Sequence, residues 1–293
     1  MCRVMDLVRR YFPGTTFLAV VTVGHPQSAS AAAVQDESVL LRVAPPVGQV
    51  SHYRVVTESR TQSPGGEAVL FEMRQEMYLT HAVARVLGDT CELDVVIDST
   101  RTETPGVPEM AAMLPDMSGL RQRVTVTTGG TVLATATVDS TVPEMLRPFL
   151  SDLQQVVPGL SVDLPKEPVR AGETWTATHR ANVTVGNVPV ATRTEFQYEL
   201  TSIARRDGAL VATIGFEGTV ESEGSGESGG PAPRAGAMSG TVSGSFDLDL
   251  TAGRVVRLSS TTQFDGEMPD PTLGEPMQIS MTTTQTMDLL PSQ

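Results

Sequence analysis

Apolar and polar residues alternate along most of this chain, and the alternation predicts antiparallel β-strands. The clearest example is segment 68–98, in which apolar side chains recur at every second position on both sides of a two-residue hairpin at Gly88-Asp89. Because successive side chains of a strand point to opposite faces, one face of this segment is expected to be buried and the other solvated.

The alternating pattern occurs twice. Residues 38–138 and residues 168–290 share one pattern, which starts at Gly48 and at Gly172 with a half-buried aromatic strand and continues through a long hairpin into a shorter one. Three pairs of glycines mark the correspondence: 124 residues separate Gly48 from Gly172, 120 separate Gly88 from Gly208, and 123 separate Gly130 from Gly253. A near-constant offset predicts two repeats that arose by duplication. Two unrelated runs of ordinary hairpins are the alternative.

Residues 143–157 follow a different period and predict the single helix of the fold. Their apolar side chains form one broad face, Thr141 precedes them as a cap, and Pro158-Gly159 ends the segment. The helix, with its flanks at 142–158, is expected to link the two repeats and to pack on the sheet.

Each repeat carries an insert in the same position, and the two inserts differ in composition. Residues 104–119 are rich in Met and Pro and are expected to form one or two short helical turns. Residues 222–237 are small, polar and rich in Gly, which predicts a flexible loop. The chain is therefore predicted to be mainly β: a large curved antiparallel sheet, like an unclosed barrel, built from two similar β repeats with one helix packed on it.

Residues 1–33 have the composition of an export signal peptide. A basic start and a short apolar stretch precede the small-residue cleavage site Ala29-Ser30-Ala31. General secretion and twin-arginine export both remain open. The remaining chain, 38–293, is expected to form a single β domain that is exported across the inner membrane and is periplasmic or extracellular. It contains no transmembrane segment, since no stretch is long and apolar enough.

The net charge of −13 narrows the range of partners. An acidic surface repels phosphate backbones, so nucleic-acid binding is not expected. Aromatic residues make up only 4% of the chain, so the core has to rest mainly on Val, Leu, Met and Ala. Cys91 is the only cysteine after the signal peptide, and its place among alternating apolar residues predicts a buried side chain.

No pattern in the sequence indicates an enzyme. His52, His81 and His179 lie far apart and lack the spacing of metal ligands, so no metal site is predicted. The sequence also contains no nucleophile elbow. Asp247 and Asp249 share one face of a strand, where paired carboxylates can perform acid–base chemistry, but alternation along a wet face explains them better. We therefore predict a non-enzymatic protein with no catalytic residues and no cofactor.

Three further segments of the chain together carry a resemblance to other proteins. A Pro-rich lead runs into a Gly-x-x-Trp motif over residues 165–175, a Met-containing hairpin occupies 68–98, and the run 240–256 alternates towards a Gly-containing turn. In these segments the chain resembles a family of uncharacterised secreted bacterial proteins that carry a domain of unknown function. The architecture is also similar to the unclosed barrels of periplasmic lipoprotein carriers, in which a curved antiparallel sheet wraps apolar cargo under helical lids. The resemblance brings no catalytic residues with it.

A curved sheet with a dry concave face needs a cover, and the Met-rich insert and the predicted helix are the candidates for a lid. An apolar small molecule or lipid is then expected to bind in a cavity between sheet and helix. The candidate ligand-binding residues are Met110, Met113, Leu114, Met117, Phe149, Trp175, Phe196 and Tyr198. The alternative is a structural or protein-interaction module of the cell envelope, with an envelope protein as partner and with both elements plugging a filled core.

Overall fold

The structure, a computed structural model, describes residues 38–63, 68–106, 111, 116–138, 162–185, 188–224, 238–269 and 276–291. All of them belong to one compact unit, Ala32–Gln293. The predicted export signal (1–33), the predicted helix (143–157) and most of the two inserts lie outside these residues, so those predictions stay predictions.

The described residues form eleven β-strands. The strands are β1 (Val50–Gln62), β2 (Val69–Leu87), β3 (Thr90–Glu103), β4 (Arg121–Thr127), β5 (Val132–Thr137), β6 (Thr174–Val185), β7 (Val188–Arg206), β8 (Ala209–Gly224), β9 (Met238–Asp249), β10 (Arg254–Pro269) and β11 (Pro276–Leu289). The alternating segment 68–98 is the β2–β3 hairpin, as the pattern predicted.

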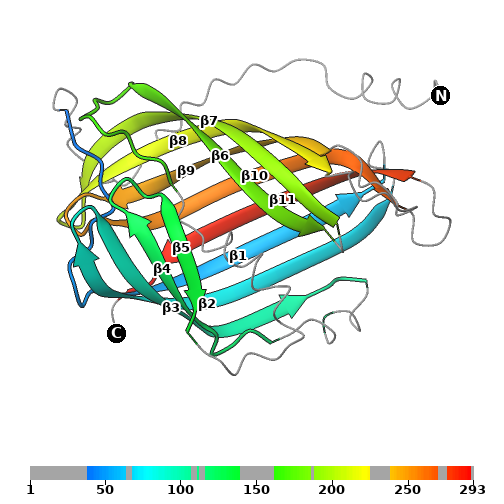
Figure 1. Cartoon of the computed structure of the whole chain (residues 1–293), viewed down its shortest axis with the longest axis horizontal. Helices are drawn as coiled ribbons and strands as arrows, with labels where there is room; N and C mark the ends of the chain where they lie inside the picture. The colour runs from blue at the N-terminus through cyan, green and yellow to red at the C-terminus, as the bar shows by residue number, and fades with distance from the viewer. Residues whose placement is uncertain are drawn as a thin grey trace, which may run out of the picture. The chain divides into compact units, whose positions relative to one another are not determined.

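One antiparallel sheet contains all of these strands, in the order β5-β4-β3-β2-β1-β11-β10-β9-β8-β7-β6 (Figure 1). Consecutive strands of each predicted repeat lie side by side, and β11 lies between β1 and β10, where it joins the two sets. The edge strands β5 and β6 are not paired with each other. The predicted mainly β fold, a curved antiparallel sheet that is not closed into a barrel, is therefore confirmed.

Turn chemistry explains two long hairpins that are closed by two-residue turns. Gly88 has a φ of 62° and opens the two-residue turn between β2 and β3. Asp207 and Gly208, between β7 and β8, have φ values of 51° and 84°. Positive φ at both central residues defines the mirror-image turn that matches the right-handed twist of the flanking strands. These short turns fix the register of both long hairpins.

One predicted boundary was wrong. Composition placed the start of the polar loop at residue 222, but β8 continues to Gly224, which pairs with Val190 of β7. Backbone hydrogen bonding to a neighbouring strand does not depend on side-chain hydrophobicity, so a small polar sequence can extend a strand at the end of a hairpin. The remainder of the predicted loop lies outside the described residues.

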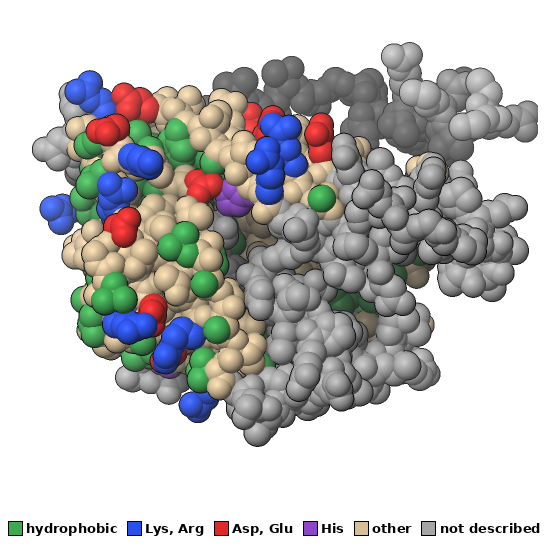
Figure 2. All heavy atoms as spheres, in the orientation of Figure 1, with side chains coloured by type: hydrophobic (Ala, Val, Ile, Leu, Met, Phe, Trp, Pro, Cys, Tyr) green, Lys and Arg blue, Asp and Glu red, His purple; other side chains and the backbone are tan. Residues whose placement is uncertain are grey.

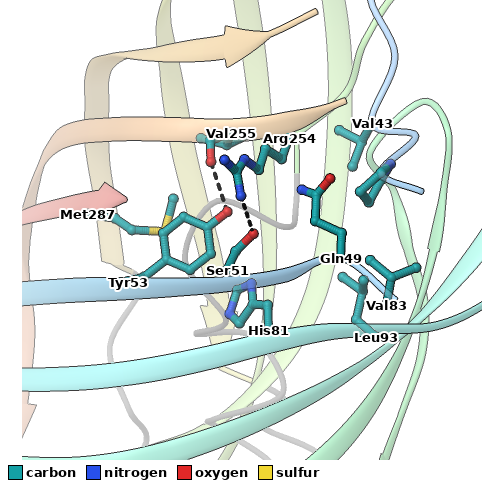
Figure 3. A pocket seen from close by; sticks show the side chains of 11 residues that line it. Val43, Gln49, Ser51, Tyr53, His81, Val83, Leu93, Arg254, Val255 and Met287 are labelled. Atoms are coloured by element: carbon teal, nitrogen blue, oxygen red, sulfur yellow. Dashed lines mark hydrogen bonds between the residues drawn. The ribbon is translucent and has the colours of Figure 1, made fainter. Parts of the chain in front are cut away.

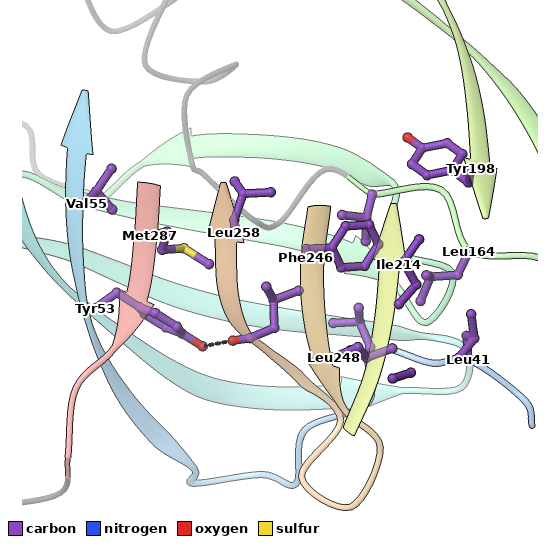
Figure 4. Close-up of a cluster of buried hydrophobic side chains, with 14 of the residues drawn as sticks. Leu41, Tyr53, Val55, Leu164, Tyr198, Ile214, Phe246, Leu248, Leu258 and Met287 are labelled. Atoms are coloured by element: carbon purple, nitrogen blue, oxygen red, sulfur yellow. Dashed lines mark hydrogen bonds between the residues drawn. The ribbon is translucent and has the colours of Figure 1, made fainter. Parts of the chain in front are cut away.

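One row of large side chains across the inner face forms the centre of the core. Each member is the register partner of the next on the neighbouring strand, and none is more than 8% exposed: Met77, Val55, Met287, Leu258, Phe246, Ile214 and Leu200. We call this row the floor row, and Figure 4 shows much of it. Burial of a large apolar side chain contributes about 1.5–3 kcal/mol, so the floor row is a main source of stability.

Segment 39–44 covers the end of the sheet at which β1, β6, β8 and β10 begin, which we call the closed end. Val43 donates a backbone hydrogen bond to Thr128 O in the β4–β5 turn, and Ala44 donates one to Gly253 O in the β9–β10 turn. The side chain of Leu41 is fully buried against the core. This segment therefore ties turns from both halves of the sheet together.

Residues 162–169, which we call the closing segment, connect the two edges of the sheet at the same end. Val162 and Leu164 donate backbone hydrogen bonds to the carbonyls of Gly130 and Gly129, next to β5. A Cβ atom at Gly130 would lie 2.4 Å from Val162, so this contact requires glycine. The segment then runs into β6, so the two unpaired edge strands are joined by loop backbone at the closed end.

A second, smaller apolar cluster lies on β2, β3 and β4. Its buried members are Val83, Cys91, Leu93, Val95, Val124 and Val126. Cys91 is 2% exposed, so its predicted burial is confirmed. Burial also raises the pKa of the Cys91 thiol, which keeps it in the weakly nucleophilic protonated form.

Candidate functional site

The inner face changes in character immediately beyond the floor row, on the side away from the closed end. The next row of register partners crosses eight strands: Gln75, Thr57, Gln285, Ser260, Gly244, Phe216, Tyr198 and Trp175. The first four side chains, on β2, β1, β11 and β10, are polar, and the last three, on β8, β7 and β6, are aromatic. All except Tyr198 are only half-buried.

The aromatic side chains form a continuous set, which we call the aromatic strip: Trp175, Phe196, Tyr198 and Phe216. The rings of Trp175 and Tyr198 are stacked, with centroids 5.5 Å apart and planes 10° apart. Phe196 lies 5.5 Å and Phe216 6.1 Å from the same tyrosine ring. Such ring pairs add about 0.5–1.5 kcal/mol each beyond the area they bury. The strip is thus a rigid apolar wall, linked to the floor row through Phe216 and Phe246 at 6.3 Å.

Glycines on the neighbouring strands make room for these rings. A Cβ atom at Gly244 would lie 2.7 Å from Cζ of Phe216 and 2.2 Å from the carbonyl oxygen of Ser259. Gly218 has the same relation to Phe196, since a Cβ there would lie 3.0 Å from Cδ1 of that ring. The rings therefore lie across the glycines, an arrangement that protects an otherwise bare stretch of strand.

A polar strip lies beside the aromatic strip on the inner surface, with β9 between them. It consists of half-buried Thr, Ser and Gln side chains on β1, β11 and β10: Thr57, Ser59, Thr283, Gln285, Ser260 and Thr262. Some of them satisfy one another, because Ser59 Oγ and Thr283 Oγ1 lie 3.1 Å apart and Gln285 Nε2 lies 3.4 Å from Thr57 Oγ1. The inner surface therefore presents an apolar wall and a hydroxyl-rich wall side by side.

Asp163 of the closing segment holds the aromatic edge of this surface. Its backbone oxygen accepts a hydrogen bond from Trp175 Nε1 at 2.7 Å, and its Oδ1 accepts one from Thr131 Oγ1 at 3.0 Å. The other carboxylate oxygen pairs with Nε2 of His179 on β6. The His179 ring in turn contacts Phe196 edge-on at 5.1 Å. Asp163 thus links the β4–β5 turn through its carboxylate and the aromatic strip through its backbone oxygen.

The electrostatics of this node follow from its partial burial. Burial alone would raise the pKa of Asp163, but the hydrogen bond and charge of His179 and the hydrogen bond from Thr131 outweigh it, so the pKa lies below the usual value. Burial, and secondly the negative charge of Asp163, raises the pKa of Tyr198. Asp163 therefore acts as an ionised anchor, and Tyr198 remains a neutral phenol.

The structure brings together three of the predicted ligand-binding residues. Trp175, Phe196 and Tyr198 are neighbours in the aromatic strip, and Met117 packs against the same core as a partly buried side chain. Met110, Met113, Leu114 and Phe149 lie outside the described residues. The described part of the predicted site is therefore contiguous.

Four other residues of this site were not among the candidates. Phe216 and Phe246 follow the alternation of their strands, so the period-two pattern contained the signal for their inward position. His179 also alternates inward with Trp175 and Ala177, but nothing in the sequence pairs it with a carboxylate. Asp163 lies in an irregular segment without periodicity, so no sequence signal could have placed it there.

The acidic pair on β9 has structural roles. Asp247, which is 9% exposed, accepts hydrogen bonds from Arg206 and Thr213. Asp249, which is 8% exposed, accepts the backbone N–H groups of Thr251 and Ala252. Both alternate with the inward side chains of Phe246 and Leu248, as predicted, but the solvent exposure expected for that face is wrong, because these partners cover both carboxylates.

Other classes of site are less well supported by the described residues. Within them, no group of three or more His, Cys, Asp or Glu side chains is placed to hold a metal ion. A shallow groove of about 640 Å³ on β6–β9 is lined mainly by exposed Thr, Ser, Gln and Glu side chains. On the face seen in Figure 2, acidic and basic side chains are interspersed over the described strands. In the ranges that the structure describes, no helix is long and apolar enough to cross a membrane.

These features define a class, a mainly β protein with one strongly curved, open antiparallel sheet and a mixed aromatic and polar inner surface. No family model matches the chain, and no curated protein matches it. The comparison with solved structures does give similar chains.

Lipovitellin, in a structure of its lipid–protein interactions, is 10% identical with a TM-score of 0.46, over 85% of this chain and 26% of the lipovitellin chain. DynF from the dynemicin biosynthesis pathway of Micromonospora chersina is 10% identical with a TM-score of 0.24, over 91% of this chain and 92% of DynF. A DUF1329 family protein from Desulfovibrio piger is 11% identical with a TM-score of 0.22, over 83% and 86%.

This chain spans about a quarter of the length of the lipovitellin chain that it matches, since the match covers 26% of it. All three TM-scores are below 0.5 and all three identities are near 10%. The likenesses therefore show neither a family nor a function for this chain, and its function has to be argued from the inner surface itself.

Proposed function

We propose that this chain is an exported, non-enzymatic protein that binds an apolar or lipid-like ligand on the inner face of its sheet. The observation that supports it most is the contrast between the floor row and the row beyond it. Side chains that only fill a core are expected to be buried as completely as the floor row, whereas Trp175 and Phe216 remain half-buried. The proposal includes two further points, namely that the chain is related to secreted proteins of unknown function and that its architecture is that of a carrier.

The composition of the surface indicates what kind of ligand would fit. The aromatic strip supplies a large, rigid apolar area at little cost in side-chain entropy, since its rings already stack on one another. The polar strip supplies hydroxyl and amide groups that can hydrogen-bond to a ligand. A chain molecule with an apolar tail and a polar group matches both walls, as expected for pockets that combine apolar linings with a few polar groups.

The single tryptophan of the chain makes the proposal testable in solution. We expect 12-bromostearate to quench the fluorescence of Trp175 saturably, because bromine quenches only on close approach and Trp175 lies in the aromatic strip. Native mass spectrometry of the gently purified protein is expected to show a bound lipid-sized mass. Phe216→Ala should weaken binding about 5-fold, which corresponds to about 1 kcal/mol.

Leu133→Ala is the matched control, because Leu133 is 58% exposed on the edge strand β5 and is not part of the aromatic strip. It should bind 12-bromostearate like the wild type. Absence of saturable quenching together with only ligand-free mass would refute a carrier. Equal weakening by both variants would show that binding does not involve the aromatic strip.

The second candidate function, a protein-interaction module of the envelope, is favoured by one observation. In the described sheet β5 and β6 each pair on one side only, and such edges can accept another strand. Cross-linking from a cysteine introduced at Leu133 tests this function in cells. It predicts a discrete adduct with an envelope protein and no lipid in the mass spectrum.

A further inference from the structure

A small cavity lies at the closed end, apart from the aromatic strip. It has a volume of about 30 Å³ and lies where β1, β2 and the start of β10 meet the segment that covers this end (Figure 3). Most of its lining is apolar, and the polar side chains are Gln49, Ser51, Tyr53, His81 and Arg254. A water molecule needs about 10–15 Å³ of such space, so the cavity has room for two waters or one small ion.

Two of the polar groups are already used by their neighbours. Arg254 Nη1 donates to Ser51 Oγ at 2.7 Å, and Tyr53 Oη donates to the carbonyl oxygen of Val255 at 3.0 Å. Two nitrogen atoms remain without a partner among the described residues, namely Nε of Arg254 and Nε2 of His81. Both are buried, and His81 as a whole is only 6% exposed. Buried polar atoms of this kind normally have a partner.

The cavity also contains an unbalanced positive charge. None of its lining residues is acidic, and Arg254 forms no ion pair within the described part of the chain. Asp249 is opposite Arg254 in the β9–β10 register, but no ion pair joins the two side chains, and Oδ1 of Asp249 instead accepts the N–H groups of Thr251 and Ala252. Arg254 as a whole is half-buried, but its Nε atom is enclosed, and enclosing part of a cation without a counter-charge is costly. A water would satisfy the hydrogen bond of Nε but would leave this charge uncompensated.

We propose that this cavity binds one small monovalent anion of the size of chloride, held by Nε–H of Arg254 and Nε2–H of His81. Both groups act as donors, and the histidine can donate from Nε2 as the neutral tautomer. The anion would compensate the charge of Arg254. It would also join β2 to β10, strands from opposite halves of the sheet. The site does not depend on the proposed ligand-binding function.

Crystals of the full chain grown in sodium bromide, with chloride as the comparison, test the site directly. The expected result is an anomalous bromine peak within hydrogen-bonding distance of Nε of Arg254. In solution, replacement of gluconate by chloride at constant ionic strength should raise the melting temperature. Above the dissociation constant each tenfold increase in chloride should add about 3–5 °C.

Arg254→Met should abolish the dependence on halide, and Arg205→Met, which removes an exposed arginine on β7, should retain it. The wild-type titration and the bromide map do not require the variant to fold. Water without an anomalous peak in the cavity overturns the proposal. Equal melting temperatures in chloride and gluconate also overturn it, because an anion bound only to the folded state must stabilise that state.

Discussion

The two halves of the sheet have the same strand order but present different inner surfaces. β1 to β5 and β6 to β10 each follow one another as a meander, and in each half every second turn lies at the closed end, namely β2–β3 and β4–β5 in the first half and β7–β8 and β9–β10 in the second. The six glycines that mark the predicted repeat all have positive φ: Gly48, Gly88, Gly130, Gly172, Gly208 and Gly253. Duplication would explain this correspondence, but it stays a prediction, because turn glycines also recur in unrelated meanders.

The difference between the halves begins above the floor row. Both halves contribute buried apolar side chains to that row, for example Met77 from β2 and Phe246 from β9. Above it, β6, β7 and β8 of the second half present aromatic rings, whereas β1 presents Thr57 and Ser59, and β10 continues this polar surface with Ser260 and Thr262. Stability therefore comes from the apolar floor row, to which both halves contribute. A binding function would come from the inner surface above the floor row, where the aromatic strip has no counterpart on β1. The following predictions test this division.

Truncation of the floor row should have the largest effect, in either half. Phe246→Ala removes a ring that is 1% exposed and should lower the free energy of unfolding by about 3–5 kcal/mol. Met77→Ala, in the other half, should cost about 2–5 kcal/mol for the same reason. Urea titration followed by circular dichroism measures both. Leu133→Ala, at an exposed position, should change stability by less than about 0.5 kcal/mol. If only one of these two floor-row variants lowered the free energy of unfolding strongly, the two halves would not contribute equally to the core.

Acid should destabilise the protein through a histidine of the first half. Burial lowers the pKa of His81 to about 4 from the ordinary 6.5. The unfolded chain therefore takes up a proton between pH 6.5 and pH 4 while the folded chain does not, so stability falls as pH falls, by about 3 kcal/mol in total. Urea titrations at pH 7 and pH 4.5 without halide should show most of this loss, and His81→Leu should abolish it. His52→Leu, an exposed histidine on β1, should retain it.

Alternation and turn chemistry were sufficient to predict the strands. The β2–β3 hairpin, the inward position of Phe196 and Tyr198 and the open mainly β sheet were all contained in period-two patterns and in turn residues such as Gly88-Asp89. These signals are local, because side-chain direction and hairpin register are fixed within a few residues.

Features that depend on distant pairing were not predictable. The place of β11 between β1 and β10 joins the last strand to the first, and no local pattern specifies that pairing. The pairing of Asp163 with His179 depends on an irregular segment that crosses between sheet edges. Asp247 was expected to be exposed because alternation predicts the face of a side chain but does not reveal the Arg206 guanidinium that covers it.

The boundary between the aromatic and polar strips should be sensitive to a single methyl group. A Cβ at Gly244 would lie 2.2 Å from the Ser259 carbonyl oxygen and 2.7 Å from the Phe216 ring, so Gly244→Ala forces strand or ring to move. The expected loss is about 1–3 kcal/mol, the usual cost of overpacking. Gly215→Ala is the matched control on β8, because its Cβ would contact only Thr201 at 3.5 Å. Equal losses for both would mean that strand propensity, and not the ring, explains the glycine at position 244.

The smallest effect is expected where the closing segment anchors the second half. Asp163→Asn keeps the size of the side chain but removes the charge that pairs with His179. The variant should lower the free energy of unfolding by about 1–2 kcal/mol at pH 7. This value lies at the low end for hydrogen bonds to charged groups, because both side chains are partly exposed. Since the pKa of Asp163 lies below its usual value, this stability should be lost as pH falls below about 4, and the variant should lack that loss. Asp94→Asn breaks an exposed ion pair with Arg123 in the first half and should cost much less. Equal losses for the two variants would show that the closing segment is no more than an ordinary surface contact.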